Sequence, residues 1–411
     1  MRLNGIFKDN LVFQRNRTIR IFGVAGEQEG TVSARIINGP EVISEGKALS
    51  SGGPFVIELP GLPAGGPYKL EVIPDNGETA VINDIYIGEV WIAGGQSNME
   101  YPLGRSDNAS KTIRECPGTN IHFYQVPVAG IFDEKAVKAE EQSRWNIISK
   151  DTCYNMSGVA FYFARDIEEL LKDGNVHIGV IGCYLGGSSV SCWQSVEALG
   201  RTPEGRRYLN EYRDKCAVWS SKEEYLEAER KYQAETDEYA AKVDSVLKGD
   251  PYLTYLEAEK AVGGGPWPPP VTPVSLRRPG SLYEAMLMRI VPYAVKGVIF
   301  YQGEEDTSGH ADDYAVVFRS MIDEWRALFR DEKMPFLFCE LPWFKLTKPG
   351  GEAEEEPGWP VVRQQQKLVA DTVPCVYLAD IKDCGENDNV HPSDKATPAE
   401  RLALLARRFI Y

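Results

Sequence analysis

The sequence predicts an α/β fold in which a doubly wound parallel sheet follows a small all-β region. From residue 85 onward, short apolar runs alternate with longer segments whose apolar residues recur at helical spacing, as strands alternating with helices do. Before residue 85 the apolar runs are short or alternating, and Gly, Pro and Asn-Gly pairs separate them. We therefore expect an N-terminal β-rich domain over residues 1–84 and an α/β domain over residues 85–411.

The expected elements of the α/β domain follow from these patterns. The strands are expected at 85–95, 121–127, 176–187, 295–303, 334–343 and 373–381, and the helices at 158–174, 312–331, 360–372 and 396–409. Strands that alternate with helices form a parallel sheet covered on both faces. The carboxyl ends of these strands should therefore meet at one edge, where ligands bind in such sheets.

A segment from about 200 to 280 does not fit this alternation. Residues 221–249 form a charged helical pattern, and the Pro-rich stretch GGGPWPPPVTPV follows it. We interpret the segment as a solvated helical insertion with a stiff linker. A lid or a dimer contact over the site is the alternative hypothesis.

The composition narrows the class of protein. Hydrophobic residues make up 43% of the 411 residues and charged residues 26%, which are ordinary globular values. The net charge of -15 argues against nucleic-acid or anionic-membrane partners. The N-terminus lacks an apolar signal segment, so we expect a cytoplasmic protein. The eight cysteines show neither C-x-x-C nor zinc-like spacing, which predicts reduced thiols and no metal or cofactor.

Polar residues and glycines follow the expected strands. In chain order they are Ser97, Gly186 with Gly187, Gln302 with Glu304, Trp343, and a loop that holds Asp388 and His391. Each residue type also has a plainer interpretation, because Ser caps helices, Gly-Gly forms tight turns and Gln bonds to loop backbone. Their joint placement at successive strand ends favours a catalytic site.

A serine becomes a strong nucleophile when a base takes its proton and a third group orients that base. The chain has four histidines, and His122 and His177 lie in or at the start of expected strands, where a structural role is more common. We favour His391 over His310 as the base, because Asp388 stands three residues before it and could reach the imidazole Nδ1. A backbone N–H at a glycine turn and a side-chain amide suit an oxyanion hole.

Four motifs occur in the order GGQSNM, YLGGSSVSCW, YQGEED and DNVHP. With them the chain resembles the SGNH-type hydrolases, which have a flavodoxin-like α/β fold. Within these hydrolases it is most similar to the sialate O-acetylesterase group of carbohydrate esterases. The stretch GIFKDNLVFQRNRTIRIFGVA also resembles the β-rich region of bacterial members, so the resemblance covers nearly the whole chain.

The resemblance implies that Ser97 is the nucleophile, that His391 is the general base and acid, and that Asp388 orients His391. It also implies an oxyanion hole built from the Ser97 N–H, a backbone N–H of the Gly186–Gly187 turn and the Gln302 amide. Further residues near the strand ends are candidate substrate contacts, although aromatic residues at such places are more often core: Trp193, Tyr301, Glu304, Trp343 and His310.

We therefore expect a serine esterase that removes O-acetyl groups from a sugar, O-acetylated sialic acid first, through an acetyl-enzyme. One alternative keeps the chemistry and takes acetylated xylan or another plant oligosaccharide as substrate. Another is a non-catalytic carbohydrate-binding protein on an esterase scaffold. A role in protein assembly through the N-terminal unit and the insertion, as an oligomer, could coexist with catalysis.

Overall fold

The predicted α/β class is confirmed by a mixed sheet with helices on both of its sides. The computed structural model describes residues 1–26, 29–116, 118–249, 253, 255–347 and 350–411. The central strands run in the order β10-β9-β11-β8-β12-β13-β16. Their bounds are β8 Ala80–Gly95, β9 Ile121–Gln125, β10 Trp145–Ile147, β11 Ile178–Tyr184, β12 Gly297–Tyr301, β13 Phe336–Cys339 and β16 Val376–Ala379.

From β9 to β16 neighbouring strands pair in parallel, and the short edge strand β10 pairs with β9 in the antiparallel sense. All seven residues of β11 are buried, as are those of β12 and β13, because helices cover both faces of this part of the sheet. Because β9, β11, β8, β12, β13 and β16 run parallel to one another, the polar residues that follow these strands lie at the same edge of the sheet.

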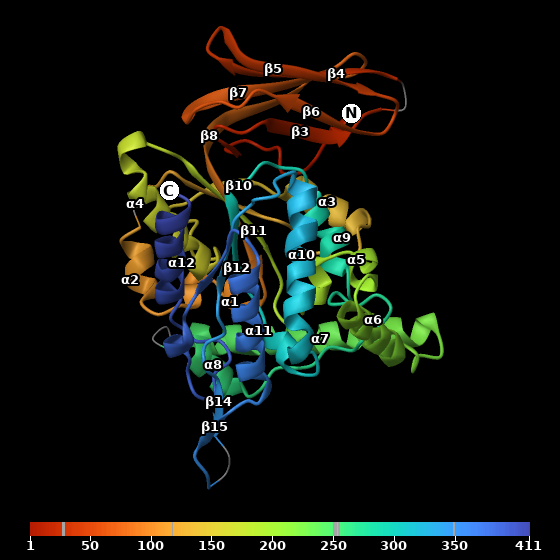
Figure 1. Ribbon diagram of the computed structural model, residues 1–411, viewed down its shortest axis with the longest axis vertical. Coiled ribbons are helices and arrows are strands. Elements are labelled where there is room, and N and C mark those ends of the chain that lie inside the picture. Colours follow the sequence, from red (N-terminus) through yellow and green to blue (C-terminus); the bar gives the residue numbers. More distant parts are fainter. Residues whose placement is uncertain (27–28, 117, 250–252, 254, 348–349) are drawn as a thin grey trace.

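Helices lie on either side of the sheet, with α4 and α12 on one side and α10 on the other (Figure 1). The four predicted helices are observed as α4 Gly158–Leu170, α10 Tyr314–Phe329, α11 Gly358–Thr372 and α12 Ala396–Phe409. The remaining helices are shorter pieces or belong to the segment around 200–280: α1 Ser97–Glu100, α2 Ala109–Arg114, α3 Glu134–Gln142, α5 Val196–Gly200, α6 Pro203–Cys216, α7 Lys222–Gly249, α8 Tyr255–Val262 and α9 Ser281–Ala285. Within the described ranges, no helix has the length and apolarity needed to cross a membrane.

The N-terminal strands lie together at one end of the molecule (Figure 1). They are β1 Arg2–Leu3, β2 Val12–Gln14, β3 Ile19–Val24, β4 Gly30–Asn38, β5 Glu41–Ser50, β6 Pro54–Leu59 and β7 Gly65–Pro74. The long strand β8 begins beside β7 and ends between β11 and β12. It therefore crosses the predicted boundary at residue 84 without a break, and the division into two domains stays a prediction.

The charged helix expected over 221–249 is confirmed as α7, and Val243 is its one buried residue among those described. A two-stranded hairpin, β14 Lys345–Thr347 with β15 Ala353–Glu355, was not expected from the sequence. It projects from the edge of the molecule near α8 and α11 (Figure 1). Its strands are short and partly exposed, so they lack the apolar run by which a buried strand is recognised.

Candidate active site

The turn after β8 presents Ser97 at the carboxyl edge of the sheet. Gly95 has φ of +133°, and a Cβ there would come within 2.1 Å of the Tyr301 carbonyl oxygen, so this position requires glycine. Gln96 is the N-cap of α1, and Ser97 is the first residue of the helix. Ser97 therefore does not cap this helix, which leaves its hydroxyl available for chemistry.

His391 lies next to that hydroxyl, as predicted for the base. Its Nε2 is 2.8 Å from Ser97 Oγ. Burial, and then the positive charge of Lys395, lower the pKa of His391 to about 4. The imidazole is thus neutral at pH 7 and can accept the serine proton.

The loop that carries His391 is held by its own polar side chains. The backbone N–H of His391 donates to Asn389 Oδ1 at 3.0 Å, and Asn389 Nδ2 donates to Glu386 Oε2 at 2.7 Å. Glu386 also accepts from the Ser393 backbone N–H at 2.8 Å. On the opposite side, Asn98 Nδ2 donates to the Val390 carbonyl at 3.0 Å, which ties the loop to the helix that begins at Ser97.

Asp388 is placed differently from the expectation. Its carboxylate accepts from the Thr347 N–H at 2.7 Å and from the Thr347 hydroxyl at 2.5 Å. No hydrogen bond joins Asp388 to His391 among the residues that the structure describes. Asp388 is exposed and has φ of +55°, and this left-handed backbone does not follow the regular turn that the spacing argument assumed. Its role in orienting His391 stays a prediction.

The Gly186–Gly187 turn lies beside Ser97, where an oxyanion hole was predicted. A Cβ on Gly186 would be 3.3 Å from Ser97 Cβ. The Gly186 N–H, however, donates to Glu100 Oε2 at 2.6 Å. Burial raises the pKa of Glu100, and the Gly186 N–H and Arg277 oppose that rise. The Gly186 N–H can therefore donate a hydrogen bond to a substrate oxygen only if its hydrogen bond to Glu100 breaks.

The Gln302 amide joins neighbouring strand ends. Its Nε2 lies 3.2 Å from Gln96 Oε1, 3.1 Å from the Ser188 carbonyl and 2.5 Å from Asp306 Oδ2. Three acceptors thus surround two amide hydrogens. The structure brings Gln302 to the site without a contact to Ser97 among the described residues, and its oxyanion role stays a prediction.

A buried polar cluster lies behind Ser97 and was not predicted from the sequence. Lys395 Nζ donates to Asn98 Oδ1 at 2.7 Å, and Asn98 Nδ2 donates to Glu304 Oε1 at 2.6 Å. Burial lowers the pKa of Lys395 to about 8 and raises that of Glu304 to about 6. Glu304, a candidate substrate contact, is instead 7% exposed within this cluster. The sequence feature that could have indicated this cluster is that Asn98 and Lys395 lie close in the sequence to Ser97 and His391.

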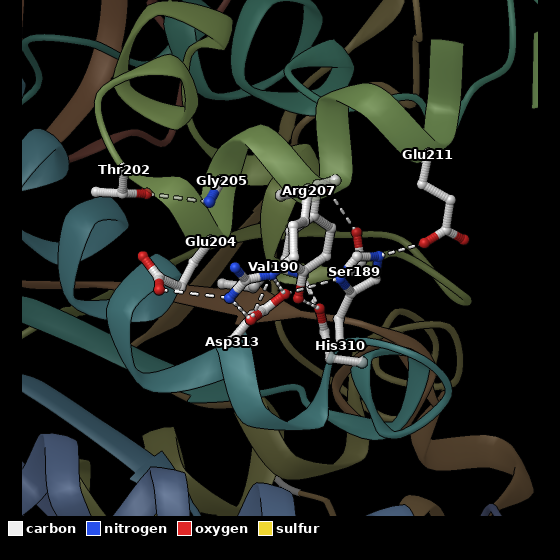
Figure 2. A network of polar contacts seen from close by, with 12 residues as sticks. Ser189, Val190, Thr202, Glu204, Gly205, Arg207, Glu211, His310 and Asp313 are labelled. Atoms are coloured by element: carbon white, nitrogen blue, oxygen red, sulfur yellow. Dashed lines mark hydrogen bonds and ion pairs between the residues drawn. The ribbon is translucent and has the colours of Figure 1, made fainter. Parts of the chain in front are cut away.

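His310 belongs to a separate network, shown in Figure 2. Its Nε2 is 2.8 Å from Glu211 Oε2 and its Nδ1 is 3.1 Å from Asp313 Oδ2. The ring stacks on Tyr208 with centroids 3.7 Å apart. Both ring nitrogens are therefore engaged away from Ser97, in agreement with the preference for His391 as the base.

The remaining histidines form a pair with each other. His122 Nε2 lies 2.8 Å from His177 Nδ1, and His122 Nδ1 lies 2.7 Å from the Asn10 carbonyl. The pair lies between the N-terminal strands and the parallel sheet, and Tyr86 stacks on His177. The two histidines thus contact each other and the N-terminal region, which fits the structural role expected for them from the sequence.

The three aromatic candidates differ in exposure. Trp193 is fully buried and donates from Nε1 to Ser188 Oγ at 3.0 Å, and Tyr301 is 1% exposed. These two side chains are core residues, which was the plainer interpretation. Trp343 is partly exposed, and Lys345 Nζ lies 5.2 Å from its ring centroid.

A pocket of about 440 Å³ opens beside the Gly186–Gly187 turn. Its walls come from α6, α7, the stretch 267–279 and the strand ends, and include Gly187, Ser189, Trp267, Arg277, Glu305 and His310. A cavity of about 820 Å³ lies elsewhere, between α2 and α4, and contains neither Ser97 nor His391 in its lining. The lining of the smaller pocket also lacks Ser97 and His391, but it includes Gly187, whose neighbour Gly186 lies against Ser97.

A serine hydroxyl within hydrogen-bond distance of a neutral imidazole, at the carboxyl edge of a parallel sheet, is the arrangement that serine hydrolases use. Residues 258–407 match the family model described as carbohydrate esterase, sialic acid-specific acetylesterase. This match includes Gln302 and His391 and leaves Ser97 outside.

Individual relatives extend over more of the chain. The sialate O-acetylesterase of Rattus norvegicus is 25% identical over 95% of this chain and 69% of its own length. That of Mus musculus is 24% identical over 98% of this chain and 72% of its own length. The crystal structure of a carbohydrate acetylesterase from Xanthomonas citri shares the fold, with a TM-score of 0.69 at 23% identity, over 99% of this chain and 74% of that one. The chain is a carboxylic ester hydrolase, and its resemblance to the sialate O-acetylesterase group of carbohydrate esterases is confirmed.

Proposed function

We propose that this chain is a serine esterase that removes O-acetyl groups from a carbohydrate, with O-acetylated sialic acid as its preferred substrate. The observation that carries the proposal is the 2.8 Å contact between Ser97 Oγ and His391 Nε2. The matches to sialate O-acetylesterases support the substrate.

In the proposed mechanism, Ser97 Oγ attacks the acetyl carbonyl carbon while His391 Nε2 takes the hydroxyl proton. The tetrahedral intermediate collapses, and the sugar oxygen leaves with the proton from His391. An acetyl ester on Ser97 remains. Water then attacks this ester, and His391 takes the water proton and returns it to Ser97 Oγ as acetate departs.

Backbone N–H groups at the strand ends would stabilise the negative oxygen of both tetrahedral intermediates. The Ser97 N–H and an N–H of the Gly186–Gly187 turn are the proposed donors, and each such donor lowers the barrier by roughly 3 kcal/mol. Glu100 holds the Gly186 N–H in the free protein. When substrate binds, Glu100 would therefore either move away from the Gly186 N–H or become protonated, because a carboxylate repels an oxyanion beside it.

We also propose the SGNH-type, doubly wound arrangement for the sheet, supported by its parallel strand order and by the helices on both of its sides. Asp388 is kept as the proposed third member of the catalytic group because of its spacing from His391, and its contact with Thr347 in the free protein predicts a smaller contribution than those of Ser97 and His391.

Acetate release tests the function. The purified protein should release acetate from O-acetylated N-acetylneuraminic acid faster than from acetylated xylo-oligosaccharides. The reverse order would assign a plant-oligosaccharide esterase. No turnover of either substrate or of 4-nitrophenyl acetate would indicate a carbohydrate-binding protein instead of an enzyme.

A further inference from the structure

Resting on the proposed function, we propose that the pocket beside the Gly186–Gly187 turn binds the sugar and selects a carboxylate-bearing one. Arg277 pairs with the sugar carboxylate, and Trp267 supplies a face on which the sugar ring packs. The insertion around 200–280 builds the outer wall of this site.

Arg277 is held next to the nucleophile by the backbone of the glycine turn. Its Nε donates to the Gly186 carbonyl at 2.7 Å, and a Cβ on Gly187 would come within 3.0 Å of the same nitrogen. Because Gly186 in turn lies against Ser97, a ligand on Arg277 is one glycine turn away from the reacting hydroxyl.

The terminal nitrogens of Arg277 have no ion-pair partner among the described residues. The other two basic side chains of the pocket already have partners: Lys215 Nζ lies 2.6 Å from Glu211 Oε1, and the His310 ring nitrogens lie within hydrogen-bond distance of Glu211 and Asp313. Arg277 is therefore the group in this pocket whose charge remains to be matched by a ligand. Its planar fork fits a carboxylate through two parallel hydrogen bonds.

Acidic side chains in the pocket do not cancel this charge. Glu211 is matched by Lys215 and His310, and Glu229 accepts from the Thr272 hydroxyl at 2.5 Å. Arg277 interacts with two further acids: Glu100, whose pKa is raised by burial, and Glu305, whose pKa is raised to about 7 by burial and by the charge of Asp306. Much of the Glu305 population is thus neutral near pH 7 and does not repel an anion.

Trp267 provides the apolar surface that a sugar ring needs. Its side chain is 56% exposed, which is unusual for tryptophan, and the Arg277 Cζ lies 5.4 Å from the ring centroid. A Cβ on Gly187 would come within 2.2 Å of the Trp267 ring, so the ring lies directly on the glycine turn. Arginine beside an aromatic face presents charge and apolar surface to one ligand.

The insertion completes the pocket from the outside. Tyr212 comes from α6, Tyr232 and Glu229 come from α7, and the prolines at 268–270 lie between them in the lining. A volume of about 440 Å³ falls in the range of small-ligand sites and suits a monosaccharide. The segment interpreted from sequence as a solvated helix with a stiff linker thus also forms one wall of the pocket.

The experiment compares two substrates that differ only in charge: O-acetylated N-acetylneuraminic acid and its methyl ester. The readout is the ratio of kcat/KM for acetate release, acid over ester. The wild type should prefer the acid by about tenfold or more, the scale of one charge-assisted pair. Arg277→Gln should bring the ratio close to one, and Arg277→Lys should keep an intermediate preference. Arg206→Gln, which removes the same charge from an exposed position of α6, should keep the wild-type ratio.

Other outcomes are equally decisive. A wild type without preference for the acid over its methyl ester overturns the inference even if every variant misfolds, and so does an Arg277→Gln protein that keeps the wild-type ratio. In both cases acetate release still supports the proposed function. If the wild type cleaves 4-nitrophenyl acetate and neither sialic acid derivative, the proposed substrate itself is wrong.

Discussion

At the scale of single residues, the proposed chemistry depends on the contact between the half-buried Ser97 hydroxyl and the neutral His391 imidazole. Ser97→Ala removes the nucleophile and His391→Ala removes the base, so each should lower kcat by at least about 1,000-fold. Steady-state hydrolysis of 4-nitrophenyl acetate measures the loss. Circular dichroism should show the same fold as the wild type, and an active His391→Ala protein would show that another group is the base.

The acid limb of the pH profile reports the state of His391. The base works when it is neutral, so kcat/KM should fall as the pH drops through its pKa in the free enzyme. Because burial and Lys395 lower this pKa to about 4, activity should persist to about pH 5. An acid limb near pH 6.5 would instead show that a carboxylate stabilises the imidazolium, and Asp388 would then be the first candidate.

Asp388→Asn separates these two possibilities directly. Thr347 holds the Asp388 carboxylate in the free protein, so the substitution should lower kcat/KM by less than about tenfold and leave the acid limb in place. A carboxylate that holds the imidazole in the correct tautomer costs about 10,000-fold when it becomes an amide. A loss of that size would show that Asp388 leaves Thr347 and joins His391 during catalysis.

At the scale of elements, Lys395 joins the start of α12 to α1 and to the Glu304–Thr307 turn. Lys395→Met removes the positive partner of this cluster and leaves Glu304 buried without it, which typically costs about 3 to 5 kcal/mol of stability. Urea unfolding should show the loss. The same change removes the charge that helps to lower the His391 pKa, so the acid limb should move to higher pH in any folded fraction.

Lys367 on α11 offers a matched control, because its side chain is about half exposed and pairs with Glu340. Lys367→Met removes the same charge from the outside of the molecule. It should leave the acid limb unchanged, because Lys367 is not among the groups that shift the His391 pKa. An equal shift in both variants would attribute the effect to net charge instead of to the cluster.

The elements that were predicted correctly are those with a strong periodic signal. Strands such as β11 are continuous apolar runs, and helices such as α10 repeat apolar residues along one face, so the sequence reveals both. Ser97 and His391 were predicted as nucleophile and base because they follow such strands, and the structure brings the two side chains together. The Asp388 contact could not be read from spacing, because a left-handed residue and the short hairpin strand β14 determine where its carboxylate lies.

At the scale of the whole molecule, long-range contacts account for what the sequence did not show. The pocket draws its lining from the glycine turn, two insertion helices and the stretch 267–279, and no local pattern connects these segments. The hydrogen bond from the Gly186 N–H to Glu100 likewise joins the end of α1 to the turn after β11, and these segments are far apart in the sequence. The cytoplasmic location and the oligomeric state stay predictions.

The histidine pair at the seam between the N-terminal strands and the sheet should make stability depend on pH. Burial lowers the pKa of His122 to about 4, so the folded state holds it neutral while the unfolded chain begins to protonate near 6.5. The stability due to this group is complete above pH 6.5 and is lost as the pH falls toward 4. Between pH 7 and pH 5, His122 alone should remove about 2 kcal/mol from the free energy of unfolding.

Urea unfolding at the two pH values measures this term, with His122→Gln as the comparison. The variant should be less stable at pH 7, because the contacts to Asn10 and His177 change, and it should lose less stability between pH 7 and pH 5 than the wild type. The change in the free energy of unfolding between pH 7 and pH 5 is compared for the wild type and the variant. The difference between these two changes is the contribution of His122, because the carboxylates and His391 titrate equally in both proteins. An equal loss of stability in both proteins would mean that water or a shift of the N-terminal region accommodates the charge, and that this region is joined to the sheet less tightly than the 2.7 Å contact between His122 and the Asn10 carbonyl implies.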